Sequence, residues 1–152
     1  MIQDFNNILI RDCTKEDMEA VSVLEKEAFG KQAWTAEQLK DAFLRNDTLY
    51  VVAETDGKVI GVCGVQNICG DGEITNVSVN PDFRNCKVAG HMLDYLIENG
   101  KKMGISAYTL EVRAGNIPAI KLYENAGFVS EGVRPGFYDN PKEDAVIYWL
   151  RF

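Results

Sequence analysis

Glu111 is the residue whose type and surroundings most directly suggest chemistry. It lies inside the apolar segment Tyr108–Val112, which we predict to be a central β-strand because helices are expected before and after it. Strands covered on both faces are usually apolar throughout, and an unpaired carboxylate there is costly. Either Arg113 or Arg134 neutralises Glu111 in a structural ion pair, or Glu111 is a polar position at the strand end, or it faces a wet cavity as a general base.

Tyr123 is a second candidate because a phenol can act as an acid. The helix predicted to begin at Asn116 doubles back toward the strand of Glu111, since Ile117 to Tyr123 spans only about 9 Å at roughly 1.5 Å per residue. A phenol with a pKa of about 10 stays protonated at neutral pH and can donate its proton to a leaving thiolate. Periodicity alone favours the other interpretation, a core tyrosine beside Ile120.

A basic loop, Arg84–Lys87, joins a predicted strand at Ile74–Val79 to an amphipathic helix. The first-turn N–H groups of a helix point outward and its dipole adds partial positive charge, so this arrangement forms an anion site. Arg84 and Lys87 add two full positive charges, and phosphate is the expected ligand. The alternative is an ordinary strand, loop and helix with a solvated basic loop. The apolar positions of the helix fall on one face: Val88, Met92, Leu93, Leu96 and Ile97.

The composition indicates one globular domain and restricts the possible partners. The chain has 152 residues, of which 46% are hydrophobic and 26% charged, and we predict a single domain over residues 1–152. The net charge of −7 opposes nucleic-acid binding and favours a basic partner. No apolar run approaches the roughly 20 residues of a membrane span, and no signal peptide is evident, so no membrane partner is expected.

The four cysteines and the single histidine argue against a metal site. The cysteines form no CxxC pair and no histidines cluster, so we predict no metal. We expect the four cysteines to be reduced and mostly structural, and reduced thiols indicate a cytoplasmic protein.

The order of the remaining segments predicts a mixed α/β sheet with about four helices. Asp56-Gly57 is a strong hairpin signal between two apolar runs. Because Tyr108–Val112 follows the central helix, we expect it to lie parallel to Ile74–Val79 with a right-handed crossover. Pro135–Pro141 is predicted to be a loop between the last two strands. The other predicted strands are Ile8–Arg11, Thr48–Glu54, Lys58–Gln66, Phe128–Val133 and Ala145–Phe152.

Two N-terminal helices are predicted from helix-start signals at Thr14 and Thr35. The connector between them, Phe29–Trp34, carries a glycine and an aromatic residue. It is either a mobile loop over a site or a helix linker with a half-buried Trp34, and we prefer the linker. The first helix has an apolar stripe formed by Met18, Val21, Leu24 and Ala28.

Two parts of the sequence resemble the GNAT acetyltransferases. Arg84 and Ala89 fit the acetyl-CoA-binding motif of that family, Arg/Gln-x-x-Gly-x-Gly/Ala, although Lys87 stands where the family has glycine. The runs LEVRAGNIPAIKLYENAGF and GVRPGFYDNPKEDAVIYW are similar to the bacterial ribosomal-protein-alanine N-acetyltransferases, with Phe137 in place of the first tyrosine of an aromatic pair. The resemblance covers nearly the whole chain. It implies the GNAT fold, in which the strands at Ile74 and Tyr108 splay apart to admit the cofactor.

The resemblance also implies roles for individual residues. Glu111 matches the general base and Tyr123 the general acid that protonates the departing sulfur. Acetyl-CoA is the implied cosubstrate. The matching cofactor-binding residues are Val77, Ser78, Val79, Arg84, Asn85, Cys86, Lys87, Val88, Ala89, Gly90 and Asn116.

The implied reaction is direct acetyl transfer to a protein N-terminus, the N-terminal alanine of ribosomal protein eighteen. An α-amine has a pKa of about 8 against about 10.4 for lysine, so a modest carboxylate base suffices. A basic ribosomal substrate also suits the acidic chain. We expect Arg134, Phe137, Tyr138 and Glu143–Asp144 to shape the peptide site, and an ordered hairpin loop with surface acids is the alternative.

Other functions remain open at this level. A small-molecule amine or antibiotic acetyltransferase belongs to the same class, because fold does not determine substrate. A non-catalytic coenzyme A-binding module is left open by Lys87, although Glu111 and Tyr123 argue against it. A covalent route through Cys86, with His91 as its base, is disfavoured because the phosphate loop lies at the wrong end of the cofactor.

Overall fold

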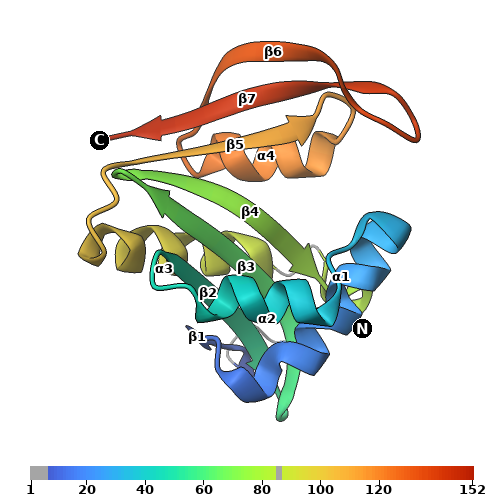
Figure 1. The fold of residues 1–152 in the computed structure, drawn as a ribbon, viewed down its shortest axis with the longest axis vertical. Helices are drawn as coiled ribbons and strands as arrows, with labels where there is room; N and C mark the ends of the chain where they lie inside the picture. The colour runs from blue at the N-terminus through green and yellow to red at the C-terminus, as the bar shows by residue number, and fades with distance from the viewer. Residues whose placement is uncertain (1–6, 85–86) are drawn as a thin grey trace.

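The computed structural model describes residues 7–84 and 87–152. Over these residues the chain forms a seven-stranded mixed sheet in the order β1-β2-β3-β4-β5-β7-β6 (Figure 1). The strands are β1 (Leu9–Asp12), β2 (Thr48–Thr55), β3 (Lys58–Ile68), β4 (Asp71–Val79), β5 (Ala107–Arg113), β6 (Val129–Tyr138) and β7 (Glu143–Arg151). The α-helices are α1 (Met18–Phe29), α2 (Ala36–Leu44), α3 (Val88–Lys102) and α4 (Ile117–Asn125), and short 3-10 turns are η2 (Lys15–Asp17), η3 (Gly30–Gln32) and η4 (Pro81–Phe83).

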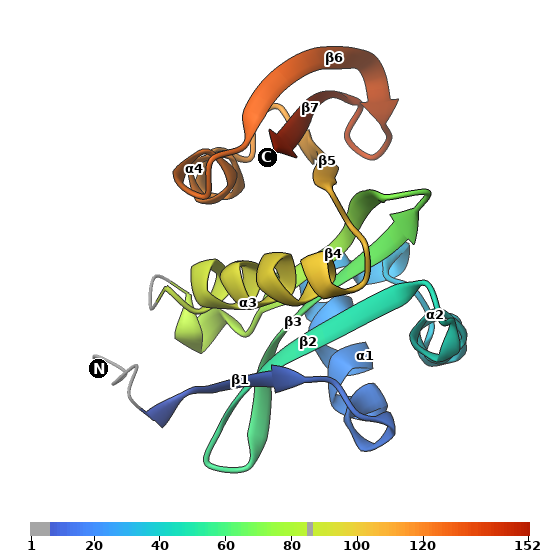
Figure 2. The same ribbon diagram turned by 90° about the vertical axis from the view of Figure 1, so that its left-hand side faces the viewer.

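The helices cover the two faces of the sheet unequally. Figure 2 shows α3 on one face of β2–β4 and α1 with α2 on the other, whereas α4 lies beside β5–β7 on the α3 side. The larger hydrophobic cluster lies under α3 and α4, and the smaller one lies between α1, α2 and the sheet. Within the described residues, no helix combines the length and apolar character that a membrane crossing needs.

The sheet opens between β4 and β5, as the resemblance implied. The two strands pair in parallel only from Asp71 opposite Ala107 to Glu73 opposite Thr109, and then diverge. A bulge at Thr75 adds one residue to β4, two positions after the last of these pairs. The predicted mixed sheet, the parallel partner of β4 and the splayed strands are therefore confirmed.

Local signals located most of the other elements correctly. The hairpin at Asp56-Gly57 joins β2 to β3, and the capping box at Thr35 begins α2 with the predicted reciprocal bonds to Gln38. All five predicted apolar positions of α3 are buried. Ala28, in contrast, is exposed, because it lines an open cavity at the C-terminal end of α1.

Two predictions about the C-terminal strands were wrong. β6 continues to Tyr138, so only residues 139–141 of the predicted loop Pro135–Pro141 lie between the strands; Pro135 is tolerated in β6 because β6 is the edge strand. β5 is not covered on both faces, since α3 and α4 lie on the same side. Burial therefore alternates along β5, with Leu110 and Val112 buried and Glu111 half-buried on the open face.

Candidate active site

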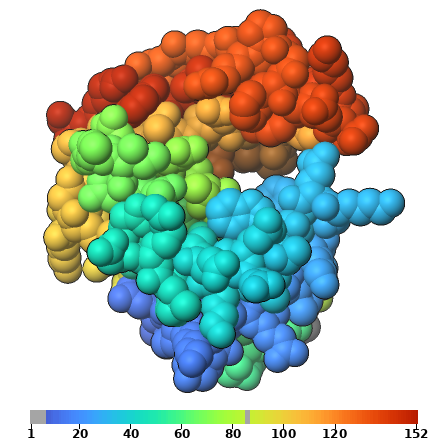
Figure 3. Space-filling model, in the orientation of Figure 1, coloured from blue at the N-terminus to red at the C-terminus, as the bar shows by residue number. Residues whose placement is uncertain are grey.

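An open cavity of about 860 Å³ lies where β4, α3 and α4 meet the C-terminal end of α1. Figure 3 shows the molecule hollowed between the α1 region and the β5–β7 region. The cavity lining includes every described residue that was predicted to bind the cofactor: Val77, Ser78, Val79, Arg84, Lys87, Val88, Ala89, Gly90 and Asn116. Asn85 and Cys86 lie outside the described residues, and so does the covalent alternative that depends on Cys86.

Several lining residues were missed at the sequence level. Ile117, Lys121 and Asn125 of α4 line the cavity, and their spacing of four residues places them on one helical face. That spacing would have identified the face once Asn116 was placed at the site. Phe29, at the start of the connector considered as a loop over a site, also lines the cavity, and so does Phe83, to which no local sequence signal pointed.

Lys87 is the N-cap of α3 and has a left-handed backbone, with φ of 62° and ψ of 16°. Glycine adopts this conformation without steric cost, which explains why glycine is usual at this position of the motif. The exposed N–H groups of the first turn of α3 follow directly, and Arg84 and Lys121 add charge to the same cavity. These donors and cations fit the pyrophosphate of coenzyme A.

Glu111 lies on the open face of β5, with 28% of its side chain exposed. Its partner is Arg134, whose Nε lies 3.5 Å from a Glu111 carboxylate oxygen. Arg113 does not share this role, because its guanidinium pairs with Glu143 at 3.2 Å. Arg134 is one of the two partners considered from the sequence, and this ion pair leaves Glu111 accessible to solvent.

The turn between β6 and β7 is held by Arg113. Its guanidinium donates to the carbonyl oxygens of Pro141 at 2.9 Å and Asp139 at 3.1 Å, and it lies over the ring of Tyr138. Glu143 accepts from Arg113 and from the backbone N–H of Gly115 at 2.7 Å. Asp144 accepts from the N–H of Gly136. The two acids thus order the hairpin, which is the structural interpretation offered for them.

The predicted peptide-site aromatics lie next to Glu111. Phe137 and Tyr138 pack edge to face at 5.0 Å, and the guanidinium of Arg134 lies 5.9 Å from the centre of the Phe137 ring. Burial raises the pKa of Tyr138, and the charge of Glu111 raises it further. Gln32, from the α1–α2 connector, donates to the Asp139 carbonyl across the opening at 3.3 Å. The connector and the hairpin therefore meet over the open side of β5.

Tyr123 is a buried member of the larger hydrophobic cluster and packs on Phe128, with ring centroids 5.8 Å apart. Burial raises the pKa of its phenol above the ordinary value, so the group stays protonated at neutral pH. Cys63 of β3 and Tyr138 of β6 are near enough to raise this pKa further. The phenol therefore lies between the two parts of the sheet, although Tyr123 is absent from the cavity lining, which its neighbour Leu122 reaches.

Across the described residues, three or more histidine, cysteine, aspartate or glutamate side chains nowhere gather as a potential metal site. The groups at the opening include a carboxylate, a phenol and two arginines.

The sequence matches the model of the Acetyltransferase (GNAT) family over residues 7–128. A Bacillus subtilis (strain 168) protein, named provisionally as a ribosomal protein bS18-alanine N-acetyltransferase, is 31% identical over 142 residues, or 93% of each chain. The crystal structure of the ribosomal-protein-S18-alanine N-acetyltransferase from Escherichia coli superposes with a TM-score of 0.85 at 26% identity, covering 95% of this chain and 93% of that one. The structure of yncA from Salmonella typhimurium, solved with its cofactor acetyl-CoA, shares the fold at 19% identity, with a TM-score of 0.84 over 96% of this chain and 94% of that one.

Proposed function

The chain belongs to the GNAT acetyltransferase family, and from this premise we propose that it transfers the acetyl group of acetyl-CoA to the α-amine of a protein N-terminus. The proposed acceptor is the N-terminal alanine of ribosomal protein bS18, and the proposed compartment is the cytoplasm. The observation that carries the proposal is a cavity suited to coenzyme A that is lined by the diverging part of β4, together with a solvent-accessible carboxylate, Glu111, on β5, the strand from which β4 diverges. The names of the relatives support the choice of acceptor.

In the proposed reaction, Glu111 accepts a proton from the acceptor ammonium group, directly or through water, so that the neutral nitrogen attacks the acetyl carbon. As the nitrogen–carbon bond forms and the carbon–sulfur bond breaks, Tyr123 donates its phenolic proton to the departing sulfur. The nitrogen then loses its second proton through solvent, and this proton restores the Tyr123 phenol. The raised pKa of Tyr123 keeps that proton available at neutral pH. Beyond Glu73 the edge of β4 has no β5 partner, so its N–H groups are suited to stabilise the developing oxyanion.

The residues around Glu111 suggest how the enzyme selects its acceptor. Phe137, Tyr138 and Arg134 surround the open side of Glu111, and the chain carries a net charge of −7, which favours a basic peptide. A Tyr138→Ala variant tests this part of the proposal separately. Mass spectrometry of a peptide mixture should show an altered preference, and an unchanged preference would exclude Tyr138 from acceptor selection.

The decisive experiment offers the enzyme an alanine-initiated basic peptide with the N-terminal sequence of ribosomal protein bS18. Tandem mass spectrometry should locate the acetyl group on the α-amine, and an N-methylated proline at the first position serves as the blocked control. Polyamines and aminoglycosides are assayed in parallel. A higher kcat/KM on these amines, or acetylation of lysine, would favour a small-molecule or side-chain acetyltransferase. Tight acetyl-CoA binding without transfer to any acceptor would favour a non-catalytic module.

A further inference from the structure

Glu25 carries a buried carboxyl group that the proposed chemistry does not use. It lies in α1, and only 1% of the residue is exposed. Burial raises the pKa of this carboxyl, and hydrogen bonds from Ser78 and Asn76 offset the rise in part. None of the ion pairs found among the described residues includes Glu25. Asp17, just before the same helix, instead pairs with Arg11 at 2.8 Å.

The partners of Glu25 lie on β4. Ser78 Oγ donates to Glu25 Oε1 at 3.2 Å, and Asn76 also hydrogen-bonds the carboxyl group. The Asn76 side-chain oxygen accepts from Thr75 Oγ1 at 2.6 Å, and Thr75 hydrogen-bonds Tyr50 of β2. These five residues, the β4 network, form a polar path beside the apolar cluster of α1 and α2.

The β4 network spans the bulge that follows the last pair between β4 and β5. Thr75 is the extra residue, because Val65 pairs with Ile74 and the preceding Gly64 pairs with Asn76. The insertion shifts the alternation of side chains by one position, so Asn76 faces α1 instead of the α3 side. The network therefore lies where β4 leaves β5 and begins to line the cavity.

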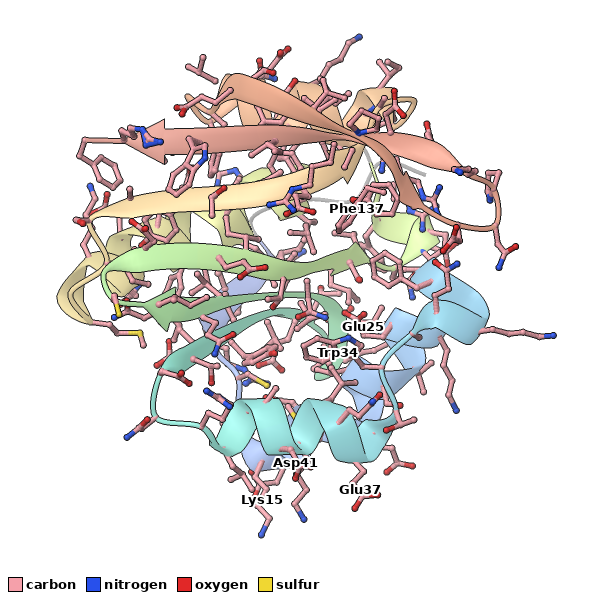
Figure 4. The ribbon with its side chains drawn as sticks, turned by 45° about the horizontal axis from the view of Figure 1, so that its top comes forward. Lys15, Glu25, Trp34, Glu37, Asp41 and Phe137 are labelled. Atoms are coloured by element: carbon pink, nitrogen blue, oxygen red, sulfur yellow. The ribbon has the colours of Figure 1, made fainter. Side chains whose placement is uncertain are left out.

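The sides of β4 carry different groups at this point. Figure 4 shows Glu25 and Trp34 on the α1–α2 side of β4, and Phe137 beyond β4 in the direction of β5 and β7. A second cavity of about 670 Å³, between α2 and β2–β4, is lined by Trp34, Tyr50 and Thr75. Ser78 instead lines the cavity proposed for the cofactor. The network thus links the underside of β4 with the cofactor wall.

We propose that Glu25 is a positioning residue for acetyl transfer, which holds the bulged segment of β4 through Ser78 and Asn76 so that the free edge of this strand faces the acetyl arm. The inference rests on the proposed function, which places the acetyl-bearing arm of acetyl-CoA along Val77–Val79. A carboxyl group suits this role because it accepts two hydrogen bonds at once. A shift of about 1 Å in reacting groups can cost about 10²-fold in rate, so the orientation of β4 matters although Glu25 touches no reacting atom.

Three variants of the full chain test the role. Glu25→Leu removes both acceptor oxygens and keeps a side chain of similar length, whereas Glu25→Gln keeps one acceptor oxygen. Ser22→Ala is the matched control, because Ser22 is another buried polar residue of α1. The measurements are kcat, the KM for acetyl-CoA, and amide hydrogen exchange of residues 74–79 compared with the amides of β2.

We expect Glu25→Leu to lower kcat about ten- to hundredfold and to leave the KM for acetyl-CoA within about twofold. Exchange of residues 74–79 should become at least about tenfold faster, with β2 unchanged. Glu25→Gln should stay within about threefold of the wild-type kcat, and Ser22→Ala should match the wild type. Adding Ser78→Ala to Glu25→Leu should cause little further increase in the exchange of residues 74–79, because both changes remove the same Ser78–Glu25 hydrogen bond.

An unchanged kcat in Glu25→Leu overturns the proposal. So does faster exchange throughout α1, β2 and β4, because that pattern describes a general loss of stability. If Glu25→Leu does not fold, Ser78→Ala decides instead, and unchanged exchange of residues 74–79 in that variant also overturns the role. Should the wild type acetylate no peptide N-terminus, the proposed function fails, but the exchange comparison still tests Glu25 because it needs no acceptor.

Discussion

The two walls of the opening between β4 and β5 are stabilised in different ways. The β4 wall lies between helices on both faces, and its residues alternate between core contacts and the buried network of Glu25. The opposite wall ends in β6, along which no residue is fully buried. Arginine contacts order that wall: Arg134 with Glu111 and Arg113 with the β6–β7 turn. One wall depends on packing, and the other depends on exposed polar contacts.

This difference assigns separate tasks to the two walls. A packed strand presents its backbone in one orientation, which suits a cosubstrate that never changes. Exposed arginines and aromatics can be exchanged with little effect on folding, which suits the recognition of a particular acceptor. We therefore expect substitutions on the β5–β7 wall to change acceptor kinetics and substitutions at the α3 end of the β4 wall to change cofactor affinity.

The largest effect is expected from Glu111→Gln, which removes the proposed base and keeps the shape of the side chain. Loss of a general base typically lowers kcat about 10²- to 10⁴-fold. Acetyl-CoA affinity, measured by calorimetry, should be unchanged, because Glu111 is not among the residues that line the cofactor cavity. Glu131→Gln is the control, since Glu131 forms a comparable surface ion pair with Arg151 at 2.9 Å. A kcat within fivefold of the wild type, on the order of 1 kcal/mol, would reduce Glu111 to a structural partner of Arg134.

Tyr123→Phe should lower kcat about 10²-fold, because the departing sulfur loses its proton donor. Folding should be preserved, since the phenyl ring keeps its contact with Phe128. Burial raises the pKa of Tyr123, so a loss of activity caused by its deprotonation should appear only above about pH 10. Tyr95→Phe, which removes a surface hydroxyl bound to Asp12, is the matched control. Full activity in Tyr123→Phe would establish the core-tyrosine interpretation.

A smaller and more selective effect is expected from Arg113→Ala. The variant releases the β6–β7 turn and should raise the KM for the peptide about tenfold, equivalent to about 1.4 kcal/mol. The KM for acetyl-CoA should not change. Arg151→Ala controls for loss of an arginine elsewhere on this wall, because Arg151 of β7 also pairs with a glutamate and lies over an aromatic ring, Trp149. Equal changes in both KM values would show that the two walls are not independent.

The sequence could predict the elements whose signals are local. The hairpin at Asp56-Gly57, the capping box at Thr35 and the buried face of α3 depend on residues that are neighbours in the chain. The glycine position occupied by Lys87 could also be interpreted, because the need for a positive φ follows from the motif. The family assignment, which rested on such motifs, is confirmed by the family model.

Long-range features were beyond these signals. The bulge at Thr75 cannot be read from a run of alternating residues, since one inserted residue reverses the face of every later side chain. The polar role of Asn76 and Ser78 was therefore not predicted. Glu25 falls on the buried face of α1, beside Val21 and Leu24, but an acidic residue in an apolar stripe does not reveal which strand it will contact. The open face of β5 likewise depends on the position of α4.

The smallest effect concerns Lys87, at the α3 end of the β4 wall. Its left-handed backbone costs an ordinary residue roughly 1–2 kcal/mol, so Lys87→Gly should stabilise the fold by up to about 1 kcal/mol after the entropy of glycine is counted. Acetyl-CoA should nevertheless bind about two- to fivefold more weakly, because a cation near the pyrophosphate is lost. Lys87→Asn separates the effect of charge from that of backbone conformation, because asparagine tolerates this backbone but is uncharged. This variant should weaken acetyl-CoA binding as much as Lys87→Gly does, and should stabilise the fold less than Lys87→Gly does. Denaturant titration and calorimetry measure the two quantities. Tighter binding in Lys87→Gly but not in Lys87→Asn would mean that the side chain obstructs the cofactor, and that the β4 wall is less well adapted to acetyl-CoA than its packing indicates.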